Sequence, residues 1–387
     1  MQKGNAAYIK KMNQKLILKC VMNEQSTSRA TISKKLALSK PTVSTLVDQL
    51  LEENWIFETG NGEASTSGGR KPVNLMFNPQ KGYIIGIDIG GTNVALGITD
   101  LNGKVYAYRD FPTQVNLEHH LFEEIKQSVE SMKWEIGIDD SQILGVGAGV
   151  PGITNVKEGT VKEAPALKWK DFPIRERLKE IFDLPIYIDN DVNINALGEH
   201  WRGVGRDKKN LIYIAIGTGI GSGIMINGKL YRGSNYSAGE IGYLVTDRVH
   251  AKDYHPVYAG YGFLESVASG SSIGNQLSER LGRNVSAKEA FDLYQQQDQA
   301  AMEVVNFAIE NLALGIANYV SLFDPELIIL GGGVSGSYSI FRKQMVDIMK
   351  RYTPKECEVV PTTFEKEAGV IGAVALFLKE FDTLIDI

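Results

Sequence analysis

An acid followed by a glycine pair is the first feature of this chain that points to chemistry. Asp88 stands in the apolar run 83–89, and Gly90, Gly91 and Thr92 follow it. Glycines let backbone N–H groups approach a ligand closely, and a carboxylate can hold a hydrated metal ion or a hydroxyl group. The stretch therefore indicates a turn that faces a phosphate group or a polyol.

A second acid, Asp191, stands between a strand-like segment and a helix predicted from about Val192 to Trp201. At that position an aspartate is often only the N-cap of the helix. The alternative is a base, or an acceptor for a sugar hydroxyl, at the carboxyl end of a strand, where ligands collect in α/β sheets. The residue pattern leaves both interpretations open.

The elements that must position these acids form an internal repeat. A strand, a Gly/Thr turn, a second strand and an Asn-Gly turn occupy residues 84–104 and again residues 211–229. A third glycine turn, 331–333, follows the apolar strand 327–330. The duplication predicts two similar α/β lobes whose Gly/Thr turns face each other across a cleft.

The first part of the chain differs in charge from the rest. Residues 1–72 hold 11 Lys and Arg against 6 Asp and Glu, whereas the remainder holds 30 against 40. A basic head on an acidic body indicates a polyanionic partner, with ordinary surface scatter as the alternative.

Three helices are predicted in this basic head, over about 8–23, 29–36 and 39–53, with Ser28 and Ser39 as candidate N-caps. A short turn between the last two helices is typical of a helix-turn-helix. The apolar face of the first helix is expected to consist of Ile9, Met12, Leu16, Cys20 and Val21.

In a helix-turn-helix the N-terminal end of the last helix enters the major groove of DNA. Hydroxyls there read base edges, and a lysine reaches a phosphate or a guanine. The residues expected at this position are Ser39, Lys40, Thr42, Ser44 and Thr45. Strand-like segments around the Gly/Ser-rich loop 60–69 predict a β-wing, with Arg70 and Lys71 touching the DNA backbone or minor groove. The alternative is a three-helix packing module with a disordered linker.

The length of 387 residues suggests two or three domains. The sequence has no uninterrupted apolar run of about 18 residues, so no membrane span is expected. No signal-peptide core follows the first residues, which favours a cytoplasmic protein. The two cysteines, Cys20 and Cys357, cannot build a structural zinc site by themselves.

Taken together, these motifs resemble those of the ROK family (repressors, open reading frames, kinases), and the winged head resembles its repressor branch. Segments 8–19 and 39–73 are most similar to the xylose-operon repressors. The resemblance implies an α/β fold, with an N-terminal winged helix-turn-helix before a two-lobed actin/hexokinase-like (ribonuclease H-like) sugar-kinase fold. The implied domains are the DNA-binding domain 1–76, a first lobe 80–193 plus 370–387, and a second lobe 194–369 that carries sugar-binding and dimerisation elements.

The resemblance also assigns site residues. In the family's phosphate and adenosine-side turns the matching residues are Asp88, Gly90, Gly91, Thr92, Asn93, Gly217, Thr218, Gly219, Gly331, Gly332 and Gly333. In the sugar site they are Asn190, Asp191, Glu240, Tyr243 and Glu265. Asp191 stands where the kinase members keep their catalytic base.

The chain departs from the family pattern at three places. Tyr243 replaces the histidine that usually serves both sugar and zinc. The segment 256–263, where the zinc-binding cysteines should fall, contains no cysteine, so no zinc is expected. Ala166 replaces a common asparagine, which removes one sugar contact.

These features favour a sugar-responsive repressor that binds a palindromic operator as a homodimer, or as a dimer of dimers, and needs no cofactor. A monosaccharide, xylose-like or glucose-like, would change its DNA affinity. The alternative is an ATP-dependent sugar kinase, glucokinase-like and using Mg²⁺, with an appended DNA-binding head. A third interpretation is a regulator whose cleft no longer binds sugar.

Overall fold

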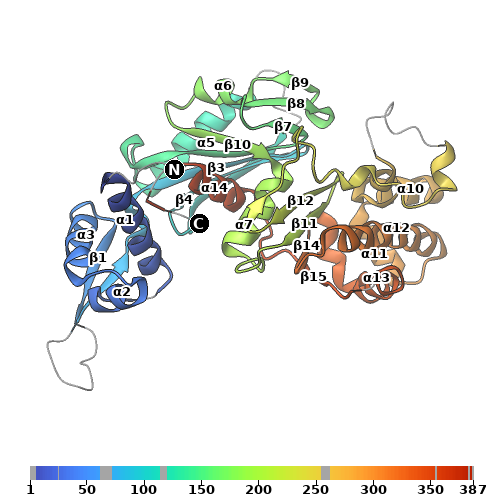
Figure 1. Ribbon diagram of the computed structural model, residues 1–387. Helices are drawn as coiled ribbons and strands as arrows, with labels where there is room; N and C mark the ends of the chain where they lie inside the picture. Colours follow the sequence, from blue (N-terminus) through green and yellow to red (C-terminus); the bar gives the residue numbers. More distant parts are fainter. Residues whose placement is uncertain are drawn as a thin grey trace.

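The computed structural model of the protein shows a small head beside two larger units, each built on its own sheet (Figure 1). The residues that it describes are 6–24, 26–61, 72–113, 120–253, 262–353, 355–381 and 384–385.

The head consists of three helices and an antiparallel pair of strands. These are α1 (Ala6–Met22), α2 (Arg29–Leu36), α3 (Lys40–Glu52), β1 (Ile56–Asn61) and β2 (Val73–Phe77). The arrangement confirms the predicted winged helix-turn-helix.

Serine caps fix the starts of two head helices. The Ser28 hydroxyl accepts a hydrogen bond from the Thr31 backbone N–H, and Ser39 accepts one from the Thr42 N–H, each at 3.2 Å. A cap of this kind satisfies a backbone donor that the helix leaves unpaired. The predicted starts of α2 and α3 are therefore confirmed.

The predicted apolar face of α1 is wrong in part. Ile9, Met12 and Leu16 are 52%, 40% and 44% exposed, whereas Ile17 and Leu18 are fully buried. Val21, four residues after Ile17, is also fully buried and fits both faces, so periodicity alone could not choose between them. The core formed with α2, α3 and β2 selects the second set.

A mixed five-stranded sheet, in the order β10-β6-β3-β4-β5, forms the first lobe. Its strands are β3 (Tyr83–Ile89), β4 (Asn93–Asp100), β5 (Val105–Pro112), β6 (Ile143–Val150) and β10 (Ile186–Asn190). Strands β10, β6 and β3 run parallel, whereas β4 and β5 are antiparallel neighbours.

The second lobe repeats this pattern in the order β13-β12-β11-β14-β15. Its strands are β11 (Leu211–Ile216), β12 (Ile220–Ile226), β13 (Lys229–Leu230), β14 (Leu327–Gly331) and β15 (Glu358–Pro361). Here too a central antiparallel pair is followed by parallel strands. The predicted duplication into two similar α/β lobes is confirmed.

Other elements cover the sheets. Beside the first sheet lie α5 (Leu121–Ile136), α6 (Ile174–Lys179) and a small sheet of β7 (Ile153–Asn155), β8 (Thr160–Ala164) and β9 (Trp169–Phe172). Beside the second lie α9 (Phe263–Ala268), α10 (Gly270–Leu281), α11 (Ala287–Gln295), α12 (Gln299–Phe323) and α13 (Tyr338–Tyr352).

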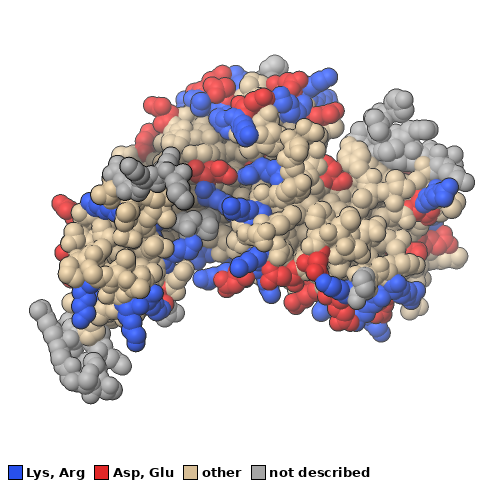
Figure 2. All heavy atoms as spheres, viewed as in Figure 1, with Lys and Arg blue, Asp and Glu red and all other residues tan. Residues whose placement is uncertain are grey.

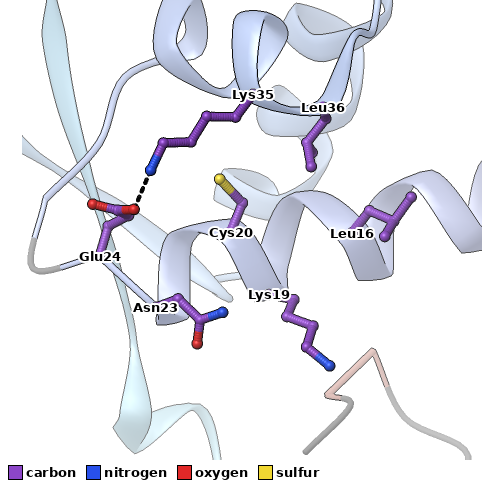
Figure 3. Close-up of a pocket in the computed structure, with 7 residues that line it drawn as sticks. All are labelled: Leu16, Lys19, Cys20, Asn23, Glu24, Lys35 and Leu36. Atoms are coloured by element: carbon purple, nitrogen blue, oxygen red, sulfur yellow. Dashed lines mark hydrogen bonds and ion pairs between the residues drawn. The ribbon is translucent and has the colours of Figure 1, made fainter. Parts of the chain in front are cut away.

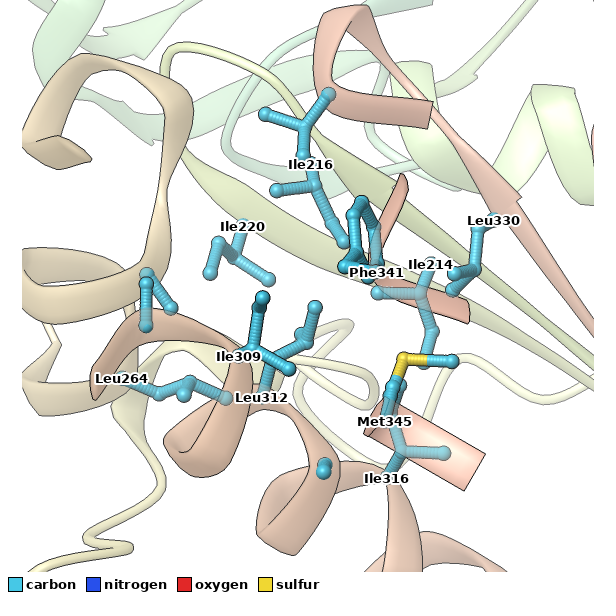
Figure 4. Close-up of a cluster of buried hydrophobic side chains, with 14 of the residues drawn as sticks. Ile214, Ile216, Ile220, Leu264, Ile309, Leu312, Ile316, Leu330, Phe341 and Met345 are labelled. Carbon is cyan, nitrogen blue, oxygen red and sulfur yellow. The ribbon is translucent and has the colours of Figure 1, made fainter. Parts of the chain in front are cut away.

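The core of the second lobe forms between its sheet and α12. Ile214 and Ile216 from β11 meet Ile309 and Leu312 from α12, with Phe341 from α13 closing the cluster (Figure 4). By length and composition α12 could span a membrane, but 61% of its most apolar stretch is buried inside the protein. We therefore interpret it as a core helix.

Two crossing helices, α7 (Asp191–Arg202) and α14 (Ala368–Glu380), connect the lobes. The former packs on β11 and β12, and the latter on β3 and β6. Where they cross, a Cβ on Gly372 would lie 2.2 Å from the Ile194 carbonyl oxygen. Only a glycine permits so close an approach of the two backbones.

The head and the first lobe share one hydrophobic core. Buried residues of α1, α2, α3 and both wing strands belong to the same cluster as residues of the first lobe, α14 and the C-terminal segment. The lobe side of this cluster consists of Ile84, Leu101, Val374, Phe377, Leu378 and Ile385. We propose the predicted division into 1–76, 80–193 plus 370–387, and 194–369 as domain boundaries, although the core crosses the first of them.

Candidate ligand site and DNA-binding head

Two acids from the first lobe meet at one edge of its sheet. Asp88 lies near the carboxyl end of β3, and Asp191 directly follows β10. Because β3, β6 and β10 run parallel, these strand ends share an edge. The negative charge of Asp191 contributes to raising the pKa of Asp88, so the two side chains act on each other.

Asp88 is held in a confined position. A Cβ on Gly369, at the start of α14, would lie 1.9 Å from its Oδ2 atom. Its Oδ1 atom is buried and has no hydrogen-bond partner among the residues that the structure describes. Burial, and then the charge of Asp191, raises the pKa of Asp88 to about 8. A buried oxygen without a partner is suited to a ligand, such as a hydrated cation.

The N-cap of α7 is Asn190 rather than Asp191. The Asn190 Oδ1 atom accepts from the N–H groups of Val192 and Asn193 at 2.9 and 3.1 Å. Its Nδ2 atom donates to the Gly152 carbonyl at 3.1 Å and to Asp191 Oδ1 at 3.0 Å. Both ends of the amide are therefore engaged inside the protein, and Asn190 orients Asp191.

Asp191 has a raised pKa. Asp191 Oδ1 accepts from the Val192 N–H at 2.9 Å, besides the bond from Asn190. Burial raises the pKa of Asp191 to about 6, although these hydrogen bonds act in the opposite direction. A carboxyl group with this pKa can serve near neutral pH as a base or as a hydroxyl acceptor.

The second lobe adds two glutamates. Glu265, on α9, accepts a hydrogen bond from the Ile220 N–H at 2.7 Å. Glu240 follows Gly239, whose φ is +96° and whose Cβ would lie 2.0 Å from the Ser222 carbonyl oxygen. A side chain is excluded at that glycine both by its backbone conformation and by space.

Both glutamates have raised pKa values. Glu240 is partly open to solvent. The protein atoms around its carboxylate, and then the negative charges of Asp191 and Glu265, raise its pKa to about 7. Burial also raises the pKa of Glu265. We call Asp88, Asp191, Glu240 and Glu265 the carboxylate cluster.

Tyr243 lies beside this cluster. It ends the short 3-10 turn Ile241–Tyr243, and its N–H donates to the Glu240 carbonyl at 3.2 Å. The side chain is 49% exposed. Tyr243 therefore places a phenol group at the rim of the site, where the family usually has a histidine.

The two predicted phosphate turns meet across the lobes. In the first, the Gly90 N–H donates to the Asn93 carbonyl at 2.9 Å. In the second, Gly217 and Gly219 close a similar turn after β11, again at 2.9 Å. The hydroxyls of Thr92 and Thr218 lie 3.4 Å apart and join the turns.

The third glycine turn lies at the same edge of the second sheet. Gly331 ends β14 beside β11, and a Cβ there would lie 1.8 Å from the Tyr213 hydroxyl. Gly332 has φ +78°, and Gly333 follows it without close neighbours. The edge thus presents backbone groups from two neighbouring strand ends, which suits a phosphate or a nucleoside.

Two further departures from the family pattern are Ala166 and the segment 256–263, which contains no cysteine. Ala166 borders the first phosphate turn, since a Cβ on Gly91 would lie 3.0 Å from the Ala166 Cβ. The segment expected to carry zinc-binding cysteines lies largely outside the described residues. Within the described residues no group of three His, Cys, Asp or Glu side chains is placed to hold a metal ion.

The head presents its predicted DNA-reading residues at the start of α3. Lys40 and Thr45 are exposed, and Thr42 and Ser44 are half-buried. The Ser39 and Thr42 hydroxyls lie 2.8 Å apart, so the cap engages both. Lys and Arg side chains gather at the end of the head that carries α2 (Figure 2). The predicted wing residues Arg70 and Lys71 lie outside the described residues.

One residue of the head has ion-pair partners that its sequence neighbourhood does not indicate. Arg29, at the start of α2, pairs with Asp48 of α3 at 2.9 Å and with Glu58 of β1 at 3.0 Å. It therefore ties the recognition helix to the wing. Its partners are 19 and 29 residues away in the chain, so a local sequence pattern cannot predict these ion pairs.

The head also contains a cavity of about 240 Å³ between α1 and α2 (Figure 3). It is lined by Leu16, Lys19, Cys20, Asn23, Glu24, Lys35 and Leu36. An ion pair between Lys35 and Glu24 lies across it. The cavity belongs to the head alone, so it is separate from the carboxylate cluster.

Comparison with known proteins agrees with this architecture. Residues 84–380 match the model of the ROK family, and residues 10–57 match that of the MarR family. A putative xylose repressor of Caldicellulosiruptor sp. (strain Rt8B.4) is 34% identical over 97% of this chain and 98% of its own.

Two solved structures share the fold. A ROK family transcriptional regulator, a homolog of the E. coli MLC protein, superposes with a TM-score of 0.79 at 23% identity, covering 95% of this chain and 96% of its own. A ROK family glucokinase from Streptomyces griseus, in complex with glucose and AMPPNP, gives 0.66 at 26% identity, covering 76% and 99%. The family match spans both lobes and the repressor match nearly the whole length, and the chain therefore belongs to the ROK family.

Proposed function

We propose that the protein is a sugar-responsive transcriptional repressor, in which a monosaccharide at the carboxylate cluster changes the affinity of the head for operator DNA. The observation that carries this proposal is the hydrophobic core shared by the head and the first lobe. A head that shares buried side chains with one lobe can respond to movements of that lobe. The name of the xylose repressor relative supports the same conclusion.

The chemistry of the cluster suits a sugar. Carboxylates accept hydrogen bonds from hydroxyl groups, and bonds to a charged acceptor are stronger than neutral ones. Asp191 and Glu240 come from different lobes, so a ligand that both hold would draw the lobes together. A xylose-like or glucose-like monosaccharide fits this arrangement of acceptors.

Operator recognition would use two heads. One α3 helix reads one half-site, so a homodimer, or a dimer of dimers, would bind a palindromic sequence with a spacing set by its geometry. We expect the protein to act in the cytoplasm, where this DNA lies, and to need no cofactor or zinc for it. The ligand must prefer one arrangement of the lobes, because equal affinity for both would switch nothing.

A gel-shift titration tests this function. The protein would be titrated against its own promoter region with and without xylose, glucose and further monosaccharides. We expect at least one sugar to change the operator affinity by about 5- to 150-fold, the usual range for coupled sites. If the operator is bound and no sugar changes its affinity, the proposal of sugar control fails.

A second candidate function is an ATP-dependent sugar kinase. It is favoured by the partnerless oxygen of Asp88 and by the raised pKa of Asp191. Asp88 would hold a hydrated Mg²⁺ ion, which neutralises phosphate charge when nucleotide is bound. Asp191 would accept the proton of the sugar hydroxyl.

An ADP-release assay over the same sugars distinguishes the two functions, with Asp191→Asn as the control. Turnover that this variant abolishes would establish the kinase. Absence of turnover, together with sugar-dependent operator binding, would leave the repressor as the function.

A further inference from the structure

Arg232 connects three parts of the molecule. It follows β13 in the second lobe, and its Nε atom donates to Asp189 Oδ2 of the first lobe at 2.7 Å. Its Nη2 atom lies 3.4 Å from Glu380 Oε1, at the end of α14. The planar guanidinium group can hold two carboxylates in fixed directions, which a lysine cannot do.

The Asp189 end of this link is next to the carboxylate cluster. The Asp189 side chain is 1% exposed and also accepts from the Asn190 N–H at 2.8 Å and from Asn193 Nδ2 at 2.9 Å. It thus supports the strand end on which Asn190 and Asp191 stand. A buried carboxylate needs such partners, and Arg232 is its cationic one.

The loop that begins at Arg232 ends at the other side of the cluster. Gly233 and Gly239 turn the chain with φ +72° and +96°, and Glu240 follows directly. The Ala238 N–H donates to the Arg232 carbonyl at 3.2 Å, so the loop closes on itself. The N–H and the hydroxyl of Ser222 hold the Gly239 carbonyl at 2.9 and 2.8 Å. A displacement of Glu240 toward a ligand therefore acts on this anchored loop and, through it, on Arg232.

The Glu380 end leads to the DNA-binding head. Next to it, Lys379 donates to the Gly228 carbonyl at 3.1 Å, which is a second tie between α14 and the second lobe. Phe377 and Leu378 of α14, and Ile385 near the C-terminus, are at most 3% exposed and belong to the core that α14 shares with the head. The end of α14 thus joins the second lobe to α1.

We propose that Arg232 is the positioning residue that couples the carboxylate cluster to the DNA-binding head, through Asp189 on one side and Glu380 on the other. The inference rests on the proposed repressor function and names its route of regulation. Ligand-induced movement of Glu240 shifts Arg232, and Glu380 follows at the end of α14. Phe377 and Leu378 of the same helix lie in the core shared with the head, so the packing of the head changes.

Two variants test the route without removing the buried pair. Glu380→Gln leaves the ion pair between Arg232 and Asp189 intact. Arg232→Lys keeps a positive charge beside Asp189 but loses the planar guanidinium group that contacts both carboxylates. Glu303→Gln, which breaks a surface pair with Arg280 in the second lobe, is the matched control. For each protein the affinity for operator, with and without an effective sugar, and the affinity for that sugar are measured.

Both test variants should bind operator and sugar singly within about twofold of the wild type. Their ratio of operator affinities with and without sugar should fall by about 2- to 30-fold, the usual effect of residues on a coupling route. The control should keep the wild-type ratio. A merely structural role would lower the melting temperature and leave the ratio unchanged. An unchanged ratio in both variants overturns the inference while the repressor function stands, whereas a wild-type protein that ignores every sugar removes both.

Discussion

The hydroxyls of Thr92 and Thr218 lie 3.4 Å apart, although 126 residues separate them in the chain. They belong to the Gly/Thr turns of the two lobes, so the lobes touch where a phosphate would be expected. A phosphate group between the turns would require them to separate. The two turns are therefore in contact in this structure. A covalent link between them would prevent the lobes from separating at this point.

A disulfide between these positions should lock the lobes. A disulfide requires Cβ atoms about 3.5–4.5 Å apart. The hydrogen bond between the two hydroxyls places the side chains close enough for a small shift of the turns to bring them together. We expect Thr92→Cys with Thr218→Cys, in a background without Cys20 and Cys357, to form the bond under oxidising conditions. The locked protein should bind operator with one affinity whether or not sugar is present, as a gel-shift assay would show.

Reduction of the disulfide should restore the sugar response, and each single cysteine variant should respond like the wild type. A cross-linked protein that still responds by the wild-type factor would show that separation of the lobes at this point is not the switch.

Glu240→Gln should weaken sugar binding without affecting DNA binding. The substitution keeps the shape of the side chain but replaces a charged acceptor with a neutral amide. We expect the Kd for the sugar, measured by calorimetry, to rise about 10- to 100-fold. Operator affinity without sugar should be unchanged, and Glu303→Gln should match the wild type. An unaltered sugar affinity would remove Glu240 from the site.

The carboxylate cluster should make stability depend on pH. The folded-state pKa of Asp191 is about 6, above the ordinary value of about 3.9, so the folded protein binds this proton more tightly than the unfolded chain. Its contribution is fully present below about pH 4 and is lost as the pH rises through 6. Asp191→Asn should therefore equal the wild type near pH 4 and exceed its unfolding free energy by roughly 1–3 kcal/mol at pH 7.5.

Urea titrations at a series of pH values measure this difference. The asparagine can keep the acceptor oxygen for the Asn190 amide and the Val192 N–H, so the fold is retained. The loss of the Asp191 charge also removes one cause of the raised pKa of Asp88, which acts in the same direction. A difference that stays constant from pH 4 to 8 would contradict the assignment.

Local signals explain what could be predicted from the sequence. Runs of β-branched residues ending in glycine turns identify β3 and β11, and serine caps mark α2 and α3. The exposed face of α1 could not be predicted, because Met12 and Leu16 have the same spacing as the residues that are buried. Which face packs inward depends on the partner helices, which lie elsewhere in the chain.

In the site, too, local sequence predicts some features, whereas others depend on residues that are distant in the chain. The sequence identifies Asn190 and Asp191 as candidate site residues but does not show which of them caps α7, because both accept a hydrogen bond from the Val192 N–H. The Gly152 carbonyl, which holds the Asn190 amide, is 38 residues away in the chain. The link from Arg232 to Asp189 spans 43 residues and has no sequence signature. Residue types at strand ends can be read locally, whereas the partners that orient them come from the tertiary fold.

Lys40→Ala should weaken operator binding through lost charge. Lys40 is exposed at the start of α3, where a helix-turn-helix meets DNA. If it contacts a phosphate, the slope of log Kd against log salt concentration should fall by about 1. Lys343→Ala, at an exposed position of α13 in the second lobe, is the control and should leave affinity and slope unchanged. An unaltered slope for Lys40→Ala would place this lysine away from the phosphates.

Gly372→Ala should destabilise the junction of the two lobes. The added methyl group would meet the Ile194 carbonyl at 2.2 Å, and both partners are helical backbone that cannot move separately. Overpacking of this kind costs about 1–3 kcal/mol, so the melting temperature should drop clearly. Gly336→Ala is a matched control, since a Cβ there meets no atom within 4 Å. If the two variants melt alike, the helices must be able to move apart at their crossing, and the close contact would not be what holds the lobes in register.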